Sequence, residues 1–413
     1  MAADAVLFVT TAYSYRTRDF VAAAEALGMP WYALSEAPVA GVDVTRVHLC
    51  ASTDWQSMAT WLGTMHARQM RFVAVHALDD SGATLAVQIA THLGLSYNHP
   101  DAVVAARNKW VMRQSMAHMA VPMPKCQRFT SQDAIEGVLA AIEFPCVIKP
   151  TELNGSRGVM RANDATEFQR AQMRLMHLLH EIYPDQSCHE YLVETYIPGV
   201  EVALEGMMDA GMLHVLALFD KPDPLEGPFF EETIYVTPSR LDEALQQQIA
   251  QVTAVAARAL GIQNGPVHAE LRINDVGMFV IEIAARSIGG LCSRTLRFGS
   301  AESLEMLIVR QSVGMWQSAP PRQQSAGGVM MIPIPAAGIL RRVSGVAQAE
   351  QVPLIEAVEI TAPLHHAIRM LPEGDSYLGF IFARGPHPAA VEDALRQAHA
   401  CLQFDIMPAI QLT

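Results

Sequence analysis

Two glutamates and an arginine in the last third of the chain have types and a spacing that could do chemistry. Glu270 and Glu282 each lie in an apolar, alternating stretch, and Asn274–Gly277 between them has turn composition. The pattern predicts a hairpin that places the two carboxylates side by side. Such like charges repel unless a cation lies between them, and Mg²⁺ accepts carboxylates beside water and phosphate ligands. Arg286 follows, where it could meet an anionic substrate group.

A lysine and a glycine-bearing loop form a second candidate site. Lys149 lies in the apolar run 146–150, and the loop Asn154–Val159 follows it. Small residues let the backbone approach an anion, and successive amide hydrogens can donate to phosphate oxygens. The order of residues is not that of a Walker A loop. The alternatives are an ordinary turn here and a solvated, salt-bridged hairpin around the two glutamates.

Three further signals are weaker. The strand end Glu194–Ile197 exposes backbone that could bond an adenine edge, with Glu201 on the ribose, although it could equally be an ordinary loop. Lys109 lies in a helix predicted over 104–119, where a lone lysine is usually solvated. The segment 219–233, rich in aromatic and charged residues, is predicted to be an exposed loop that lines a substrate pocket or forms a long hairpin.

Composition bounds the class of protein. The 413 residues exceed one ordinary core, and the formal charge of −13 argues against a nucleic-acid partner. The six cysteines are scattered, as expected for free thiols in a reducing compartment. The N-terminus lacks a basic head, and no apolar run approaches the roughly 20 residues that span a bilayer. We therefore expect a cytoplasmic protein without a membrane partner.

The elements that must position these residues follow one order along the chain. Strands alternate with helices at first, which predicts a small parallel α/β layer, and a proline pair at 122 and 124 marks a boundary. A second linker is predicted at Ala319–Arg322. The predicted domains are 1–103 (α/β), 104–195 (linker helix and first subdomain), 196–318 (second subdomain with the site) and 319–413 (C-terminal domain).

The ordered set of these signals, over roughly residues 104–313, resembles the ATP-grasp superfamily. The flanking regions also look like that superfamily's usual flanks. The resemblance implies an α/β and α+β multidomain protein, with an ATP-grasp fold between an N-terminal parallel α/β (pre-ATP-grasp) domain and a C-terminal α+β domain. It also implies an enzyme that joins a carboxylic acid to an amine.

The resemblance further implies a role for each matching residue. The lysines and the glycine loop look like the phosphate-binding groups, 194–197 looks like the adenine hinge, and Glu201 resembles the ribose acceptor. The implied ATP contacts are Lys109, Lys149, Gly155, Ser156, Arg157, Gly158, Glu194, Thr195, Tyr196, Ile197 and Glu201. Glu270 and Glu282 resemble the Mg²⁺ ligands, with Mn²⁺ as a substitute. Arg286 resembles the catalytic arginine that steadies the substrate carboxylate and the acyl-phosphate.

One position departs from the superfamily pattern and points to a branch. The common Glu-x-Asn-x-Arg has Ala284 in place of the asparagine ligand, so two carboxylates must suffice or another residue contributes. The variant sequence resembles the bacterial L-amino-acid ligases, whose substrate-binding turn Gly289 and Gly290 match. His268, on the same strand face as the first glutamate, is a further expected substrate contact.

The expected reaction is the ATP-dependent joining of two L-amino acids through an acyl-phosphate, with release of ADP and phosphate, for a peptide antibiotic or phytotoxin. The rivals are a biotin carboxylase-like subunit, an ATP-grasp ligase for another acid and amine, and a nucleotide sensor without turnover. Related enzymes are often dimers, so a homodimer is one expectation.

The paired-carboxylate hypothesis makes a direct prediction. Glu282→Gln should abolish metal-dependent turnover and leave the fold intact, because the amide keeps the shape and removes the charge. The measurement is product formation against Mg²⁺ concentration, with circular dichroism as the control for folding. An active variant with unaltered Mg²⁺ dependence would refute the ligand assignment.

Overall fold

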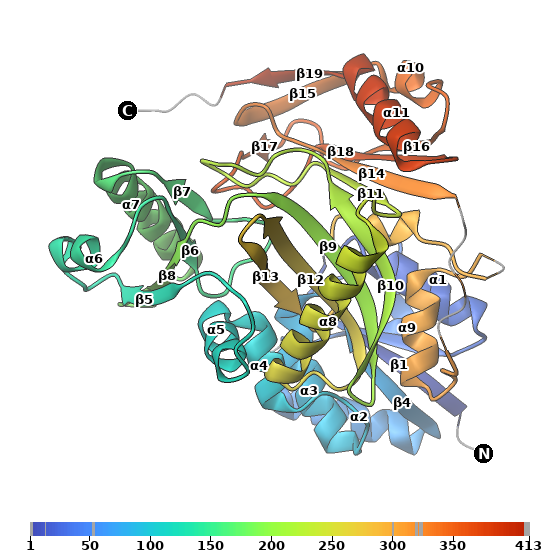
Figure 1. The fold of residues 1–413 in the computed structure, drawn as a ribbon. Helices are drawn as coiled ribbons and strands as arrows, with labels where there is room; N and C mark the ends of the chain where they lie inside the picture. The colour runs from blue at the N-terminus through green and yellow to red at the C-terminus, as the bar shows by residue number, and fades with distance from the viewer. Residues whose placement is uncertain are drawn as a thin grey trace.

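The structure is a computed structural model that describes residues 3–12, 14–51, 54–299, 301–318, 321 and 325–408. Apart from Pro321, the predicted linker at Ala319–Arg322 lies outside these residues. Among them, no helix is both long and apolar enough to cross a bilayer. In Figure 1 the N-terminal part of the chain (blue) lies at the bottom and the C-terminal part (red) at the top. A sheet behind the helix α8 (Glu243–Leu260) lies between them.

The N-terminal layer is a parallel sheet of order β3-β2-β1-β4, as the alternating pattern predicted. Its elements are β1 (Ala3–Val9), α1 (Thr17–Ala26), β2 (Trp31–Ser35), η1 (Val44–Arg46), β3 (Val47–Leu49), α2 (Trp55–Ala67), β4 (Met70–Ala77), η2 (Asp80–Gly82) and α3 (Ala83–Leu93). The core strand β1 is apolar throughout its second half, because both of its faces are covered.

The single helix predicted over 104–119 is wrong. The structure has two helices, α4 (Pro100–Arg107) and α5 (Lys109–His118), because Asn108 is extended between them. The Asn108 side chain accepts hydrogen bonds from the amides of Trp110 and Val111, at 3.0 and 3.2 Å. This N-cap satisfies amides that a helix start leaves unpaired, and it places Lys109 in the first turn of α5.

An antiparallel sheet of order β5-β8-β6-β7 forms the next layer, at the left of Figure 1. Its elements are β5 (Cys126–Thr130), α6 (Ile135–Ala141), β6 (Cys146–Pro150), β7 (Met160–Ala162), α7 (Ala165–Ile182) and β8 (Glu190–Thr195). β6 coincides with the apolar run 146–150 that contains Lys149. The loop between β6 and β7 carries the predicted glycines.

Three buried ionic side chains join this sheet to α5. Arg113 of α5 donates to both carboxylate oxygens of Glu194 in β8, at 2.7 and 3.2 Å. The ammonium of Lys149 in β6 lies 2.6 Å from the same carboxylate. Burial opposes the charge on Glu194, but the two cations outweigh burial and hold its pKa at about 2.

The largest sheet among the described residues has eight strands, in the order β13-β12-β9-β10-β11-β14-β18-β16. Its strands are β9 (Val200–Asp209), β10 (Met212–Lys221), β11 (Ile234–Thr237), β12 (Gly265–Asn274), β13 (Gly277–Ala284), β14 (Ala326–Ile332), β16 (Ile355–Ile360) and β18 (Gly379–Gly385). α8 (Glu243–Leu260) packs on β9, β10, β12 and β13. The sheet therefore contains strands from both sides of the predicted boundary at 318.

The remaining elements lie in the last third of the chain. They are η3 (Cys292–Thr295), α9 (Leu304–Ser312), β15 (Gly338–Ser344), α10 (Val346–Glu350), β17 (Ala367–Ile368), α11 (Pro388–Cys401) and β19 (Gln403–Met407). One apolar core runs from the N-terminal layer through α9 into this sheet, so the layers share a packed interior. The three predicted domain boundaries stay predictions.

Removal of the cap at the start of α5 should be measurable. Asn108→Ala is expected to lower the free energy of unfolding by about 1 kcal/mol, because two amides of the first turn lose their acceptor. Urea unfolding at neutral pH measures it. Asn108→Ser is the matched control, since serine also accepts at an N-cap; equal losses in the two variants would contradict the capping role.

The buried ionic joint predicts a pH dependence. Glu194→Gln should lower the free energy of unfolding at neutral pH by about 3 kcal/mol, because it leaves two buried cations without their anion. The folded pKa lies below the ordinary value of 4.5, so this contribution is complete above pH 4.5 and is lost as the pH falls toward 2. The difference between wild type and variant should shrink over that window.

The control for this joint is Glu190→Gln, in the same strand. Glu190 pairs with Arg128 at the surface, where the two side chains are 43% and 44% exposed, so its loss should change stability little. Equal pH profiles for the two variants would contradict the assignment of the acid-sensitive charge to Glu194.

Candidate active site

One cavity of about 770 Å³ lies where the N-terminal layer, the two antiparallel sheets and the C-terminal segment meet. Most of the predicted site residues line it. They are Lys109, Lys149, Gly155, Ser156, Glu194, Thr195, Tyr196, Ile197, Glu201, His268, Glu270, Glu282, Arg286, Gly289 and Gly290. Arg157 and Gly158 are not among its lining residues. Residues scattered over nearly two hundred positions are thus brought to one space.

The predicted hairpin of β12 and β13 is confirmed. Glu270 and Glu282 are direct cross-strand partners, and a bulge follows Glu270. The Asn274 side chain accepts from the amides of Val276 and Gly277, which closes the turn. Both carboxylates consequently open into the same cavity.

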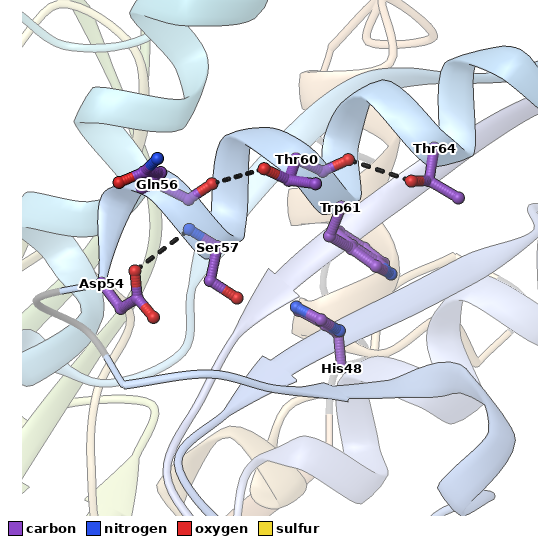
Figure 2. A pocket seen from close by; sticks show the side chains of 7 residues that line it. All are labelled: His48, Asp54, Gln56, Ser57, Thr60, Trp61 and Thr64. Carbon is purple, nitrogen blue, oxygen red and sulfur yellow. Dashed lines mark hydrogen bonds between the residues drawn. The ribbon is translucent and has the colours of Figure 1, made fainter.

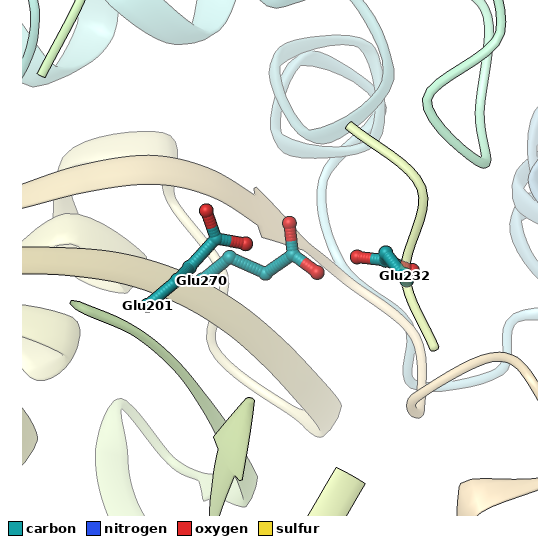
Figure 3. A group of neighbouring side chains, drawn as sticks. All are labelled: Glu201, Glu232 and Glu270. Carbon is teal, nitrogen blue, oxygen red and sulfur yellow. The ribbon is translucent and has the colours of Figure 1, made fainter. Parts of the chain in front are cut away.

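A buried ammonium that the sequence analysis missed holds the first carboxylate. Lys221 Nζ at the end of β10 lies 2.5 Å from Glu201, 2.6 Å from Glu232 and 3.1 Å from Glu270. Figure 3 shows the three carboxylates turned toward one another, with Glu232 coming from a separate segment. Tyr235 places its ring 5.0 Å from the same ammonium.

The predicted exposed loop at 219–233 is therefore wrong in its first part. Phe219 is fully buried, and Asp220 and Lys221 are less than 10% exposed, because all three lie in β10 and pair with β9. Only the segment after Lys221 is a loop, and its end brings Glu232 into the cavity. The charged residues before Pro222 belong to the strand.

The carboxylates around Lys221 differ in how readily they take up a proton. Burial and the neighbouring charge of Glu270 raise the pKa of Glu232 to about 7, against the opposing effect of Lys221. Burial also opposes the charge on Glu270, but Lys221 and His268 outweigh burial and hold its pKa well below the ordinary value. Glu270 thus stays ionised, whereas Glu232 takes up a proton more readily.

These residues fit a divalent cation. Ligand oxygens of Glu201, Glu232 and Glu270 lie within 4.8 Å of one another, and Glu282 is paired across the hairpin with Glu270. Carboxylate oxygens are the donors that Mg²⁺ prefers. Lys221 already occupies one side of the cluster, so a metal would be held on the cavity side by Glu270 and Glu282. Ala284 is a buried apolar residue and offers no ligand.

The predicted substrate arginine has an anionic partner from the N-terminal layer. Arg286 Nε donates to Asp80 Oδ2 at 2.7 Å. Burial acts against the charge on Arg286, yet Asp80 outweighs burial and raises its pKa. Asp80 follows the end of β4, so a strand of one layer fixes the arginine of another. Its contribution was missed because the two residues lie 206 positions apart.

The turn after β13 is held from three sides. The Arg16 guanidinium donates to the carbonyl oxygens of Ser287 and Ile288. The Ile288 amide donates to Glu205 at 3.0 Å, and the Gly290 amide donates to Tyr15 at 2.9 Å. Gly290 has φ +58, and a Cβ there would meet Met331, so this close approach requires glycine.

His268 connects this turn to the carboxylates. Its Nδ1 lies 3.4 Å from Glu205, and its Nε2 lies 3.5 Å from Glu270. Burial would lower its pKa, but the two glutamates outweigh burial and raise it to about 9. The predicted placement of His268 beside Glu270 is confirmed, and its partner Glu205 is a further residue that the sequence analysis missed.

The other end of the cavity contains the predicted nucleotide residues. Lys109 Nζ donates to the Leu153 carbonyl at 2.7 Å and lies 3.7 Å from Glu282. The backbone of Thr195–Ile197 lines this end, while the Glu194 side chain is committed to its cations. Glu201 is bonded to both Lys221 and Arg272, so a ribose hydroxyl would have to share its oxygens.

A second hollow lies away from these residues. It measures about 520 Å³ on the outer side of α2. Figure 2 shows His48 of β3 beside Trp61 of α2; their rings stack at 4.7 Å. Asp54 caps the helix by accepting from the Ser57 amide. Thr60 and Thr64 donate to helix carbonyls, and Asp54 is the one acidic residue among the lining residues, which include no lysine or arginine.

Two family models match the chain, and together they cover its middle and its end. The model described as ATP-grasp domain matches residues 142–295, and the model described as L-amino acid ligase C-terminal domain 2 matches residues 330–407. The first stretch contains the β12–β13 hairpin and the glycine loop. The second contains the C-terminal wall of the cavity.

Individual proteins resemble this chain over part of its length or at low sequence identity. The alanine–anticapsin ligase of Bacillus subtilis (strain 168) is 30% identical over 215 residues, which are 48% of this chain and 44% of that protein. The chain spans less than two thirds of the length of such relatives. The L-amino acid ligase structure from Bacillus licheniformis shares the fold, with a TM-score of 0.83, 21% identity, and coverage of 98% of this chain and 100% of that chain.

The same fold occurs in a carboxylase. The biotin carboxylase domain of the Hydrogenobacter thermophilus 2-oxoglutarate carboxylase, solved with MgADP and bicarbonate, has a TM-score of 0.67 and 15% identity, over 97% of this chain and 90% of that chain. The C-terminal stretch of this chain matches the L-amino acid ligase model, whereas the likeness to the carboxylase is one of fold alone. The predicted fold class is confirmed, and the chain contains an ATP-grasp domain followed by an L-amino acid ligase C-terminal domain 2.

Proposed function

We propose that the protein is an ATP-dependent ligase that joins two L-amino acids into a dipeptide through an acyl-phosphate. The observation that carries the proposal is the single cavity in which Glu270, Glu282 and Arg286 face two buried lysines. A site of this composition can neutralise a phosphoryl group in transfer and hold a carboxylate beside it. The family match supports the choice of amino acids as substrates.

Each group has a part in the proposed reaction. Lys109 and Lys149 hold the ATP phosphates at one end of the cavity, where burial and fixed partners keep the two ammonium groups in place. The backbone of Thr195–Ile197 takes the adenine edge. When bound at Glu270 and Glu282, Mg²⁺ (or Mn²⁺) supplies charge neutralisation for the phosphates.

The bond changes follow from this arrangement. A carboxylate oxygen of the first amino acid attacks the γ-phosphorus, ADP leaves, and an acyl-phosphate remains. The amine of the second amino acid then attacks the acyl carbon, loses a proton, and phosphate leaves. Arg286, fixed by Asp80 at 2.7 Å, steadies the carboxylate first and the developing oxyanion next. The glycine loop keeps out water that would hydrolyse the acyl-phosphate.

The substrate class rests on the relatives. The Bacillus subtilis relative is named for joining alanine to anticapsin, which supports an amino acid as one of the two substrates. A peptide antibiotic or phytotoxin as the product stays a prediction. The cytoplasmic location and the homodimer stay predictions. The turn at Gly289 and Gly290, held by Arg16 and Tyr15, would contact the substrate backbone.

The rivals predict different reactants. A carboxylase would consume bicarbonate, and a sensor would bind ATP without turnover. The set of two buried lysines, two partly buried glutamates and a partly buried arginine, each with an ionic partner, favours turnover, because a sensor needs no such set for the γ-phosphate. The fold alone is shared with carboxylases, so only the reaction itself separates these functions.

The decisive experiment mixes the protein with ATP, Mg²⁺ and pairs of amino acids, and measures phosphate release together with product mass. We expect release that depends on particular pairs, and a product one water lighter than their sum. Arg286→Ala should lower product yield by about a hundredfold, the cost of one lost oxyanion donor, with ATP affinity nearly unchanged. Release that depends on bicarbonate, or on no acid at all, would contradict the proposal.

A further inference from the structure

The predicted phosphate-binding loop is fastened to the C-terminal part of the chain. The Gly158 amide donates to the Pro372 carbonyl at 2.8 Å. Arg157 Nε donates to the Glu373 carbonyl at 2.9 Å, and its Nη1 lies 3.3 Å from Asp375. Arg157 and Gly158, predicted to contact ATP, are therefore bonded to this segment instead of lining the cavity.

A second set of contacts fastens the helix behind the loop. Arg174 of α7 forms a two-pronged ion pair with Glu373, in which Nη2 donates to Oε2 at 2.7 Å. Arg369 donates to Glu181, near the end of the same helix, at 2.7 Å. We call residues 369–375 the latch segment. Glu373 is its centre, since its carbonyl holds the loop and its carboxylate holds the helix.

The latch segment continues directly into the cavity. Asp375, Ser376 and Tyr377 line the same space as Gly155 and Ser156 of the loop. One stretch of chain thus contacts the loop on its outer side and forms the substrate wall on its inner side. The loop needs outside support: it lies between β6 and β7 without a ladder of its own, and three of its residues have positive φ.

We propose that Glu373 is a positioning residue, which holds the phosphate-binding loop closed over the cavity while the C-terminal segment is docked. This inference rests on the proposed function for what the loop covers, but the contact can be tested without any activity. Its catalytic consequence is that retention of ATP and exclusion of water both depend on the C-terminal segment. If these were ordinary exposed salt bridges, breaking them would change neither the retention of ATP nor the exclusion of water.

The test uses charge reversal in the full-length protein. Glu373→Arg and Arg174→Glu each place like charges together, and the double variant restores an opposite pair. The matched control is Glu356→Arg, which reverses another glutamate of the C-terminal part, paired with Arg384 and outside the cavity. The two sites have partly exposed partners, so all four proteins should fold.

Hydrogen exchange of the Gly158 amide reads the latch directly, since its acceptor is Pro372. Each single reversal should speed this exchange by about two- to fivefold, the range that one partly exposed pair supports. The double variant should return to the wild-type rate, and the control should not change. Unaltered exchange in Glu373→Arg, or no rescue in the double variant, would overturn the proposal.

Kinetics then distinguish positioning from mere stability. The single reversals should raise KM for ATP and the ratio of phosphate released to dipeptide formed, by about two- to fivefold, with rescue in the double variant. If wild type shows no turnover with amino acids, the proposed function fails while the exchange result still decides the latch. If turnover is normal but the reversals change neither KM for ATP nor the ratio of phosphate to dipeptide, the latch proposal fails and the proposed function stands.

Discussion

The site depends on keeping several carboxylates ionised inside the protein. A buried charge is costly unless it is paired, and each group of acids lies against cations of the chain. Arg113 and Lys149 hold Glu194, and Lys221 holds Glu201, Glu232 and Glu270 together. Burial and the charge of Glu270 outweigh Lys221 at Glu232 and raise its pKa to about 7. Glu270 and Glu282 on the cavity side offer the oxygens that a divalent cation would take.

The same electrostatic need explains why distant layers converge. Asp80 from the parallel layer fixes Arg286, and Arg16 from the same layer holds the turn that follows it. These contacts are short because the supporting strands share one apolar core with α9 and the large sheet. The geometry of the reacting groups is therefore set by the docking of whole layers, and a shift of one layer would move the arginine relative to the carboxylates.

The sequence predicted the features that are formed by residues close together along the chain, and it missed contacts between distant segments. The hairpin of Glu270 and Glu282 follows from alternation and a turn of four residues, so it was predictable. Lys221 was not, because its partners come from two other strands and a loop, and its neighbour Pro222 favoured a loop. The break at Asn108 did have a signal, because asparagine is a favoured N-cap residue. The prediction of one continuous helix overlooked it.

The large sheet has a consequence for how this architecture can be divided. β14, which lies beyond the predicted boundary at 318, pairs along its length with β11, and β18 and β16 extend the sheet from there. Any shortened chain that lacked β14 would expose the unpaired edge of β11, a row of free amides and carbonyls that invites self-association. Exchange of C-terminal parts between relatives should therefore cut beyond Ile332, so that the recipient keeps its own strand.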